Sequence, residues 1–113
     1  MKRALIVVDM QAGFLNERNR WIIPNIQKIL KEEKYELVIE ANFHAEPGSL
    51  WDRQTHWTFP LEPTVPEIKD LLPTPSILVI KTTKSVFKGD KDVTTLLKKT
   101  GVEEVHIVGL DAK

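Results

Sequence analysis

The sequence has 113 residues, of which 16 are basic, 16 are acidic and none is cysteine. A chain of this length forms one domain with a single core, and its zero net charge creates no long-range field that would attract nucleic acid or anionic lipid. The lack of cysteine excludes disulfides and thiolate metal sites within these residues. We therefore expect one domain over residues 1–113 that binds neither nucleic acid nor a membrane.

The amino-terminal residues favour a cytoplasmic location. Met1 to Arg3 lead directly into a short apolar run, whereas a secretory signal has a longer apolar region followed by a cleavage site. No apolar run approaches the roughly 20 residues that a membrane-spanning helix needs.

Four near-continuous aliphatic runs have the length of strands. They are residues 4–8, 37–41, 77–80 and 105–110. Runs of this kind are typical of parallel strands that are buried on both faces. The sequence therefore predicts a parallel sheet.

Residues 21–34, between the first two runs, have the pattern of an amphipathic helix. Pro24 suits a position in the first turn. The apolar face consists of Ile22, Ile26, Ile29 and Leu30. This pattern predicts a crossover helix between two parallel strands.

Two further helices are expected. One starts at Thr64, with Glu67 three residues later as a capping box, and stops at the prolines that follow. The other lies between the third and fourth runs, where Asp90 or Asp92 caps its start and Gly101 ends it in a left-handed conformation.

The segment 43–63 has neither a helical nor a strand period. It contains Trp51, Trp57, two histidines and Pro47-Gly48. A structureless stretch of this length within a compact domain is usually functional or disordered, and its aromatic content argues against disorder. Two interpretations stay open, a pocket wall and a simple cover over one end of the sheet, and both can hold.

Alternating strands and helices predict an open α/β sheet with helices on both faces and right-handed, Rossmann-like crossovers. Ligands of such sheets bind outside the carboxyl ends of the strands. Polar side chains follow the four predicted strands there: Asp9, Asn42, Lys81 and Asp111. We expect any chemistry at this edge.

Four motifs in this order resemble those of the isochorismatase-like cysteine hydrolases, a family that includes nicotinamidases and related amide hydrolases. The opening strand and its aspartate lie in residues 4–14, and a loop motif is formed by Pro47-Gly48-Ser49 and Trp57-Thr58. Residues 80–87 resemble the strand that carries the family's lysine, and residues 105–111 resemble the strand that leads to its nucleophilic cysteine. The resemblance covers essentially the whole chain.

The resemblance implies a catalytic role for Asp9 and Lys81, with Lys84 the less favoured lysine. Asp9 would act as acid and base, and the Lys81 ammonium would stabilise a thiolate that attacks a small amide or a related bond. The family's cysteine and the strands after it have no counterpart here. We therefore expect a hydrolase fold truncated after the fourth strand, incomplete at its carboxyl end and inactive alone.

Further side chains are expected around a small-molecule substrate. They are Gln11, Phe14, Asn42, Trp51, Trp57 and Phe87. We expect no cofactor. A non-catalytic binding or assembly module that retains this aromatic pocket is the alternative function.

Nicotinamidases use an aspartate and two histidines to hold a metal beside the active site, and the matching stretch here contains Asn42 and His44, with His56 further along. An asparagine in place of the carboxylate removes the charge that would hold a dication. We predict no bound metal, with Glu46 and Asp52 as substitute ligands otherwise.

Three other residues receive structural interpretations. Ser85 and Ser49 lie near the expected pocket, but no Ser-x-x-Lys spacing supports a serine nucleophile and Ser49 suits a turn. His106, inside an apolar strand, is expected to be packed or at an edge.

A final expectation concerns assembly. The family's strand order, applied to a chain that stops after its fourth strand, leaves residues 105–108 as an exposed apolar edge, and such edges recruit another strand. We therefore expect a homo-oligomer formed through this edge.

Overall fold

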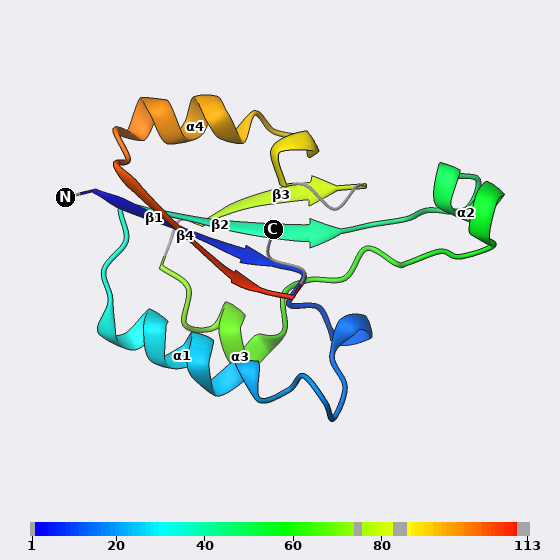
Figure 1. Ribbon diagram of the computed structural model, residues 1–113, viewed down its shortest axis with the longest axis horizontal. Coiled ribbons are helices and arrows are strands. Elements are labelled where there is room, and N and C mark those ends of the chain that lie inside the picture. Colours follow the sequence, from blue (N-terminus) through cyan, green and yellow to red (C-terminus); the bar gives the residue numbers. More distant parts are fainter. Residues whose placement is uncertain (1, 74–75, 83–85, 111–113) are drawn as a thin grey trace.

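The computed structural model describes residues 2–73, 76–82 and 86–110. Its centre is a sheet of four parallel strands in the order β3-β2-β1-β4 (Figure 1). The strands are β1 (Arg3–Val8), β2 (Leu37–Phe43), β3 (Ile77–Lys81) and β4 (Glu104–Gly109). This arrangement confirms the predicted α/β fold with an open parallel sheet.

Helices cover both faces of the sheet. α4 (Val93–Thr100) lies on one face, and α1 (Ile22–Glu32) and α3 (Pro66–Lys69) lie on the other, as Figure 1 shows. A fourth helix, α2 (Leu50–Thr55), lies beyond the carboxyl ends of the strands. Two single turns of 3-10 helix, η1 (Ala12–Phe14) and η2 (Val86–Lys88), follow β1 and β3.

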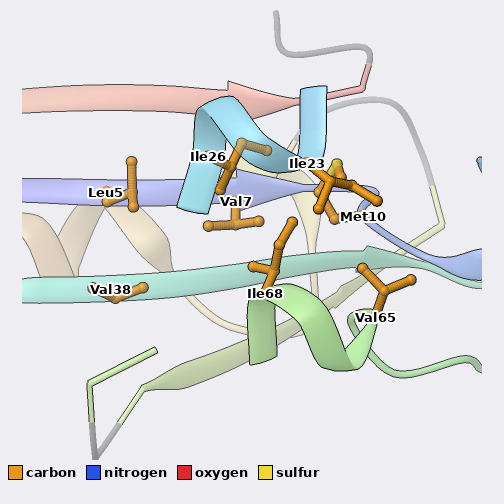
Figure 2. Close-up of a cluster of buried hydrophobic side chains, with 8 residues drawn as sticks. All are labelled: Leu5, Val7, Met10, Ile23, Ile26, Val38, Val65 and Ile68. Atoms are coloured by element: carbon orange, nitrogen blue, oxygen red, sulfur yellow. The ribbon is translucent and has the colours of Figure 1, made fainter. Parts of the chain in front are cut away.

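A separate apolar cluster forms on each face of the sheet. The cluster under α1 and α3 consists of Leu5, Val7, Met10, Ile23, Ile26, Val38, Val65 and Ile68 (Figure 2). The cluster under α4 consists of Ile6, Val8, Ile39, Ala41, Val79, Val86 and Val93. Alternate residues of β1 enter opposite clusters, which is why its aliphatic run has no polar interruption.

The strand order reverses next to β1. The chain moves from β1 to β2 and β3 in one direction, and α4 then returns it to the other side of β1, where β4 pairs with residues Arg3 to Val8. In open α/β sheets the ligand site lies outside the carboxyl ends of the strands at this reversal. Asp9, the first residue after β1, occupies that position.

The strand ends differ from the prediction by one or two residues. β2 continues to Phe43 and β3 to Lys81, so Asn42 and Lys81 lie within strands and not just after them. β4 begins at Glu104 and ends at Gly109. The polar character of Asn42 and Lys81 suggested a strand end, whereas main-chain pairing with the neighbouring strand continues through both residues.

The predicted capping box at Thr64 is wrong. α3 begins at Pro66, and its N-cap is Val65, whose side chain makes no capping hydrogen bond. The Thr64 hydroxyl instead lies 3.4 Å from the side-chain amide of Asn42. A contact with a distant strand has therefore replaced the local contact that the sequence pattern suggested.

The segment 43–63 contains one helix that its lack of periodicity did not predict. The Ser49 hydroxyl accepts a hydrogen bond from the Asp52 amide, so Ser49 is the N-cap of α2 and not an ordinary turn residue. The helix ends at His56, which has a left-handed backbone with φ of 54°. A helix of six residues is too short to show a clear apolar face.

The predicted ends of the helix before β4 are confirmed. Asp92 caps α4, since its carboxylate accepts hydrogen bonds from the Thr95 amide at 3.0 Å and the Thr95 hydroxyl at 2.7 Å. Gly101 ends the helix with φ of 72°. The first helix also has the predicted bounds to within two residues, although its most buried positions are Ile23 and Ile26. Over the described ranges, no helix is long and apolar enough to span a membrane.

The Asp92 cap predicts a pH-dependent stability. The hydrogen bonds from Thr95 lower the pKa of the Asp92 carboxyl below its usual value. The cap therefore stabilises the fold at a pH above the unfolded pKa of about 3.9. This stabilisation is lost as the pH falls through the pKa of the folded state. Asp92→Ala should therefore lower the urea midpoint at neutral pH, with the difference from wild type shrinking below about pH 4. Asp92→Asn, which caps without a charge, is the control, and its urea midpoint at neutral pH should fall less than that of Asp92→Ala. A deficit of Asp92→Ala that does not change with pH would contradict the assignment.

Gly109 predicts a second effect on stability. Its φ is 115°, and a Cβ built there would lie 2.1 Å from the Val8 carbonyl oxygen. Gly109→Ala should therefore lower the free energy of unfolding by about 2 to 5 kcal/mol, from backbone strain together with overpacking. Gly48 has φ of 83°, but a Cβ built there would have no atom within 4 Å, so Gly48→Ala should lower the free energy of unfolding by only about 1 to 2 kcal/mol. Equal losses in urea unfolding would show that the close approach at Gly109 is unimportant.

Candidate active site

Asp9 turns the chain sharply at the carboxyl end of β1. Its backbone is left-handed, with φ of 55°, a conformation that aspartate tolerates better than most non-glycine residues. The Asp9 amide donates a hydrogen bond to the Ala41 carbonyl at 2.9 Å, which fixes the turn to β2. A non-glycine residue held in this conformation is a feature that clusters at functional sites.

Lys81 meets Asp9 across the sheet. Its Nζ lies 2.7 Å from Asp9 Oδ1, although β3 and β1 are separated by β2. Neighbouring strands lie about 4.8 Å apart, so the long lysine stem has to extend over the central strand. The two residues for which the family resemblance implies the acid/base and cation roles therefore form one ion pair.

This ion pair is buried. The Lys81 side chain has no exposed surface, and the Asp9 side chain is 6% exposed. Removing two charges from water is costly, and their attraction offsets that cost only while both are present. The pair places a proton acceptor and a fixed positive charge side by side at the reversal of strand order.

An aromatic cluster adjoins the ion pair. The Lys81 Nζ lies 5.2 Å from the centre of the Phe43 ring, a cation–π distance. Phe43 in turn contacts the other members of the cluster, which are Phe14, Trp51, Trp57 and Phe59. Phe14 stacks on Phe59 with the ring centroids 4.1 Å apart. Residues from η1, β2, α2 and the loop after α2 therefore form one apolar wall.

Three of the predicted substrate-binding residues, Phe14, Trp51 and Trp57, belong to this wall. The Trp51 indole donates a hydrogen bond to the Thr82 carbonyl at 2.7 Å, which attaches α2 to the end of β3. Trp57 is 38% exposed. Phe87 lies on η2 and is about half exposed. The wall covers the sheet end and borders the ion pair, so both interpretations of the segment 43–63 stay open.

Gln11, which is expected beside the substrate, joins the ends of two strands and the segment around Glu62. Its side chain is fully buried. The side-chain amide accepts a hydrogen bond from the Phe43 amide at 2.8 Å and donates to the carbonyls of Phe43 and Glu62 at 3.0 and 3.2 Å. The Gln11 side-chain amide thus pairs with the main chain at the end of β2. It occupies the position that a peptide group of β1 would have if the main chain had not turned away at Asp9.

Asn42 is also buried, on the opposite face of the sheet from the cluster under α4. Its side-chain nitrogen lies 3.4 Å from the Thr64 hydroxyl and 3.5 Å from the Glu62 carbonyl oxygen. These two contacts and those of Gln11 tie the segment 62–64 to the ends of β1 and β2.

The residues considered as metal ligands are dispersed. His44 Nδ1 lies 3.0 Å from the Phe59 carbonyl oxygen, and His56 is exposed at the end of α2. The Asp52 carboxylate accepts a hydrogen bond from the Gly48 amide at 2.8 Å, and Glu46 is exposed. Within residues 2–73, 76–82 and 86–110, no group of three or more histidine, aspartate or glutamate side chains is arranged to hold a metal ion.

His106 has two polar partners on β4 and beside it. Its Nδ1 lies 2.9 Å from the Tyr35 hydroxyl, and its Nε2 contacts the Glu104 carboxylate. Burial raises the pKa of the Tyr35 hydroxyl above its usual value. This network lies in the first half of β4, away from Asp9. Lys84, Ser85 and Asp111, the other residues considered by sequence, lie outside the described residues.

The sequence analysis missed a second buried charge. Glu40, in the middle of β2, is 2% exposed and accepts hydrogen bonds from Lys69 Nζ at 2.7 Å and Ser76 Oγ at 3.0 Å. The sequence did contain a signal, a glutamate inside an aliphatic strand, because a buried carboxylate requires a cation or a hydrogen-bond donor as its partner. The partner could not be identified from sequence, since Lys69 is 29 residues away.

Comparison with known proteins supplies the family. The family model described as "Isochorismatase domain" matches residues 3–113. No curated protein sequence matches the chain significantly.

Solved structures share the fold. An isochorismatase-like hydrolase from Alkaliphilus metalliredigens superimposes with a TM-score of 0.75 at 23% identity, over 97% of this chain and 68% of that one. An N-carbamoylsarcosine amidase from Thermoplasma acidophilum gives 0.74 at 19% identity, over 96% and 68%. A nicotinamidase/pyrazinamidase from Bacillus subtilis gives 0.67 at 19% identity, over 97% and 72%. At these identities the likeness is one of fold.

The ion pair predicts a strong coupling between two substitutions. Lys81→Met leaves the buried Asp9 carboxylate without its ammonium partner and should lower the free energy of unfolding by about 3 to 5 kcal/mol. Asp9→Asn should also destabilise, because the buried ammonium then lacks its carboxylate. The double variant removes both charges and should lose much less than the sum of the single losses. Urea unfolding of the four proteins measures the coupling, and additivity within about 0.5 kcal/mol would contradict a direct ion pair.

Proposed function

Because this chain belongs to the isochorismatase domain family, we propose that it carries the acid/base part of a hydrolase site that acts on a small amide or a related bond. The observation that carries this proposal is the buried contact between Asp9 and Lys81 at 2.7 Å. The pair lies at the reversal of strand order, where ligands of open α/β sheets bind. Two of the similar structures, an N-carbamoylsarcosine amidase and a nicotinamidase, bear the names of amide hydrolases.

In the proposed mechanism Asp9 moves a proton. Its carboxylate accepts the proton of a thiol, the resulting thiolate attacks the carbonyl carbon of the substrate, and the proton passes to the nitrogen that leaves. Water then hydrolyses the thioester and regenerates the thiol. Asp9 suits this role because its backbone turn fixes the carboxylate at the end of β1.

Lys81 supplies the fixed charge of the site. An ammonium near a thiol favours the thiolate form and stabilises negative charge that develops in the transition state. Its burial against Phe43 excludes water, which strengthens both effects. The aromatic wall beside it would contact the apolar part of a small substrate.

The thiolate itself has to come from residues outside these 113, because they contain no cysteine. We therefore propose that the 113-residue chain alone does not turn over substrate. The alternative function, a non-catalytic binding or assembly module, is favoured by the same lack of cysteine together with the aromatic wall, and it needs no nucleophile.

The test is an assay of ammonia release from a panel of small amides and N-carbamoyl compounds. The protein expressed to the stop codon of its reading frame should turn over at least one compound, whereas residues 1–113 alone should turn over none. Asp9→Asn and Lys81→Met should each lower kcat at least about 100-fold. Lys98→Met, an exposed lysine on α4, is the matched control and should leave kcat unchanged.

Two results would count against the hydrolase. One is an Asp9→Asn variant that is folded by circular dichroism and has unchanged activity. The other is a reading frame that supplies no cysteine, combined with saturable binding of small amides without turnover, which would favour the binding module.

A further inference from the structure

The end of β2 lies between the two members of the ion pair. Asp9 follows β1 on one side of β2, and Lys81 ends β3 on the other side. Lys81 is the register partner of Phe43, and its Nζ lies 5.2 Å from the centre of the Phe43 ring. The position of Phe43 therefore bears directly on where the Lys81 ammonium lies.

Strand β1 ends before it reaches Phe43. Its pairing with β2 stops at Ala41, and the chain turns at Asp9. The same register, if continued, would bring Met10 opposite Phe43, but the Met10 carbonyl accepts a hydrogen bond from the Val65 amide at 2.8 Å instead. The turn that places Asp9 at the site thus takes away the β1 partner of Phe43.

The main-chain groups of Phe43 point toward β1, because such groups alternate between the two sides of a strand. The Ala41 carbonyl accepts a hydrogen bond from the Asp9 amide on the β1 side, at 2.9 Å. The His44 amide donates to the Lys81 carbonyl on the β3 side, at 3.0 Å. The amide and carbonyl of Phe43 therefore face the position that β1 has left, and a buried peptide group needs a hydrogen-bonding partner there.

The Gln11 side chain fills this position. Its oxygen accepts a hydrogen bond from the Phe43 amide at 2.8 Å, and its nitrogen donates to the Phe43 carbonyl at 3.0 Å. The same nitrogen donates to the Glu62 carbonyl at 3.2 Å. One fully buried side-chain amide thus satisfies both main-chain groups of Phe43. A buried network in which each polar group is paired rigidifies the residues that it joins.

We propose that Gln11 is a positioning residue of the hydrolase site. It holds the Phe43 ring against the Lys81 ammonium and so fixes the ammonium beside Asp9. The inference rests on the proposed function, because it gives Gln11 a part in the chemistry of that ion pair. A purely structural glutamine would stabilise the fold and leave the ion pair unchanged.

The test is the coupling between Asp9→Asn and Lys81→Met, measured by urea unfolding of the protein expressed to the stop codon of its reading frame. In the Gln11→Met background this coupling should fall at least about tenfold as a ratio of unfolding equilibrium constants, which is about 1.4 kcal/mol. Methionine keeps the length of the side chain and removes the amide. A structural role alone would lower the stability of every member of the cycle equally, so the coupling would not change.

Gln27→Met is the matched control. The Gln27 side-chain nitrogen donates a hydrogen bond to the Glu67 carbonyl at 3.0 Å, which joins α1 to α3 outside the sheet. Its loss should lower the free energy of unfolding without changing the coupling between Asp9 and Lys81.

Phe43→Leu tests the same route and replaces Gln11→Met if that variant fails to fold. It keeps the main chain that Gln11 binds and removes the ring, so the coupling should fall here too. Where both variants fold, their combined loss of coupling should be smaller than the sum of the two, since both act on one ring. In the active protein, Gln11→Met should lower kcat at least about tenfold and change KM less than about twofold, because it displaces catalytic groups and not the substrate.

Three results would overturn the proposal. They are a coupling that Gln11→Met or Phe43→Leu leaves unchanged, a coupling lost as strongly in Gln27→Met, and a Gln11→Met enzyme whose KM rises while kcat stays the same. The coupling is measured without substrate. A protein that turns over no amide but loses the coupling as expected would therefore contradict the proposed function, while the effect of Gln11 on the ion pair would stand.

Discussion

The buried contact between Asp9 and Lys81 is the interaction on which the site depends. A carboxylate and an ammonium that are almost fully removed from water need each other, because either charge alone would carry a large desolvation penalty. The pair joins the ends of two strands that are not neighbours in the sheet. Its geometry therefore depends on β2, which lies between them and supplies Phe43 beneath the ammonium.

Hydrogen bonds between side chains and the main chain hold the surroundings of the ion pair in place. Gln11 continues the hydrogen bonding of β1 after the chain has turned, and Trp51 attaches α2 to the end of β3. These contacts hold the aromatic wall against the site without using a charged group. At the β3 edge charged side chains satisfy the main chain instead: Asp90 accepts a hydrogen bond from the Ile80 amide, and the Lys91 ammonium contacts the Leu78 carbonyl.

Much of the fold could be predicted because its signals are local. The aliphatic runs identified all four strands to within two residues, and Asp92 and Gly101 gave the ends of α4. The errors arose where a distant contact replaced a local one. Thr64 has the spacing of a capping residue, yet its hydroxyl contacts Asn42, and the short helix α2 has no apolar face that a periodic pattern could reveal.

The sequence by itself placed Asp9 and Lys81 at one edge of the sheet, because each ends an apolar strand run and the carboxyl ends of parallel strands share one edge. The resemblance of the surrounding motifs to a known family then implied their catalytic roles. Only the tertiary structure decided that they touch, that Gln11 and Asn42 bond to the segment 62–64, and that Lys69 lies beside Glu40. The physical reason is the separation along the chain between the residues that interact. Periodicity and capping are set by neighbours within a few residues, whereas these pairings join strands that meet only after the sheet has formed.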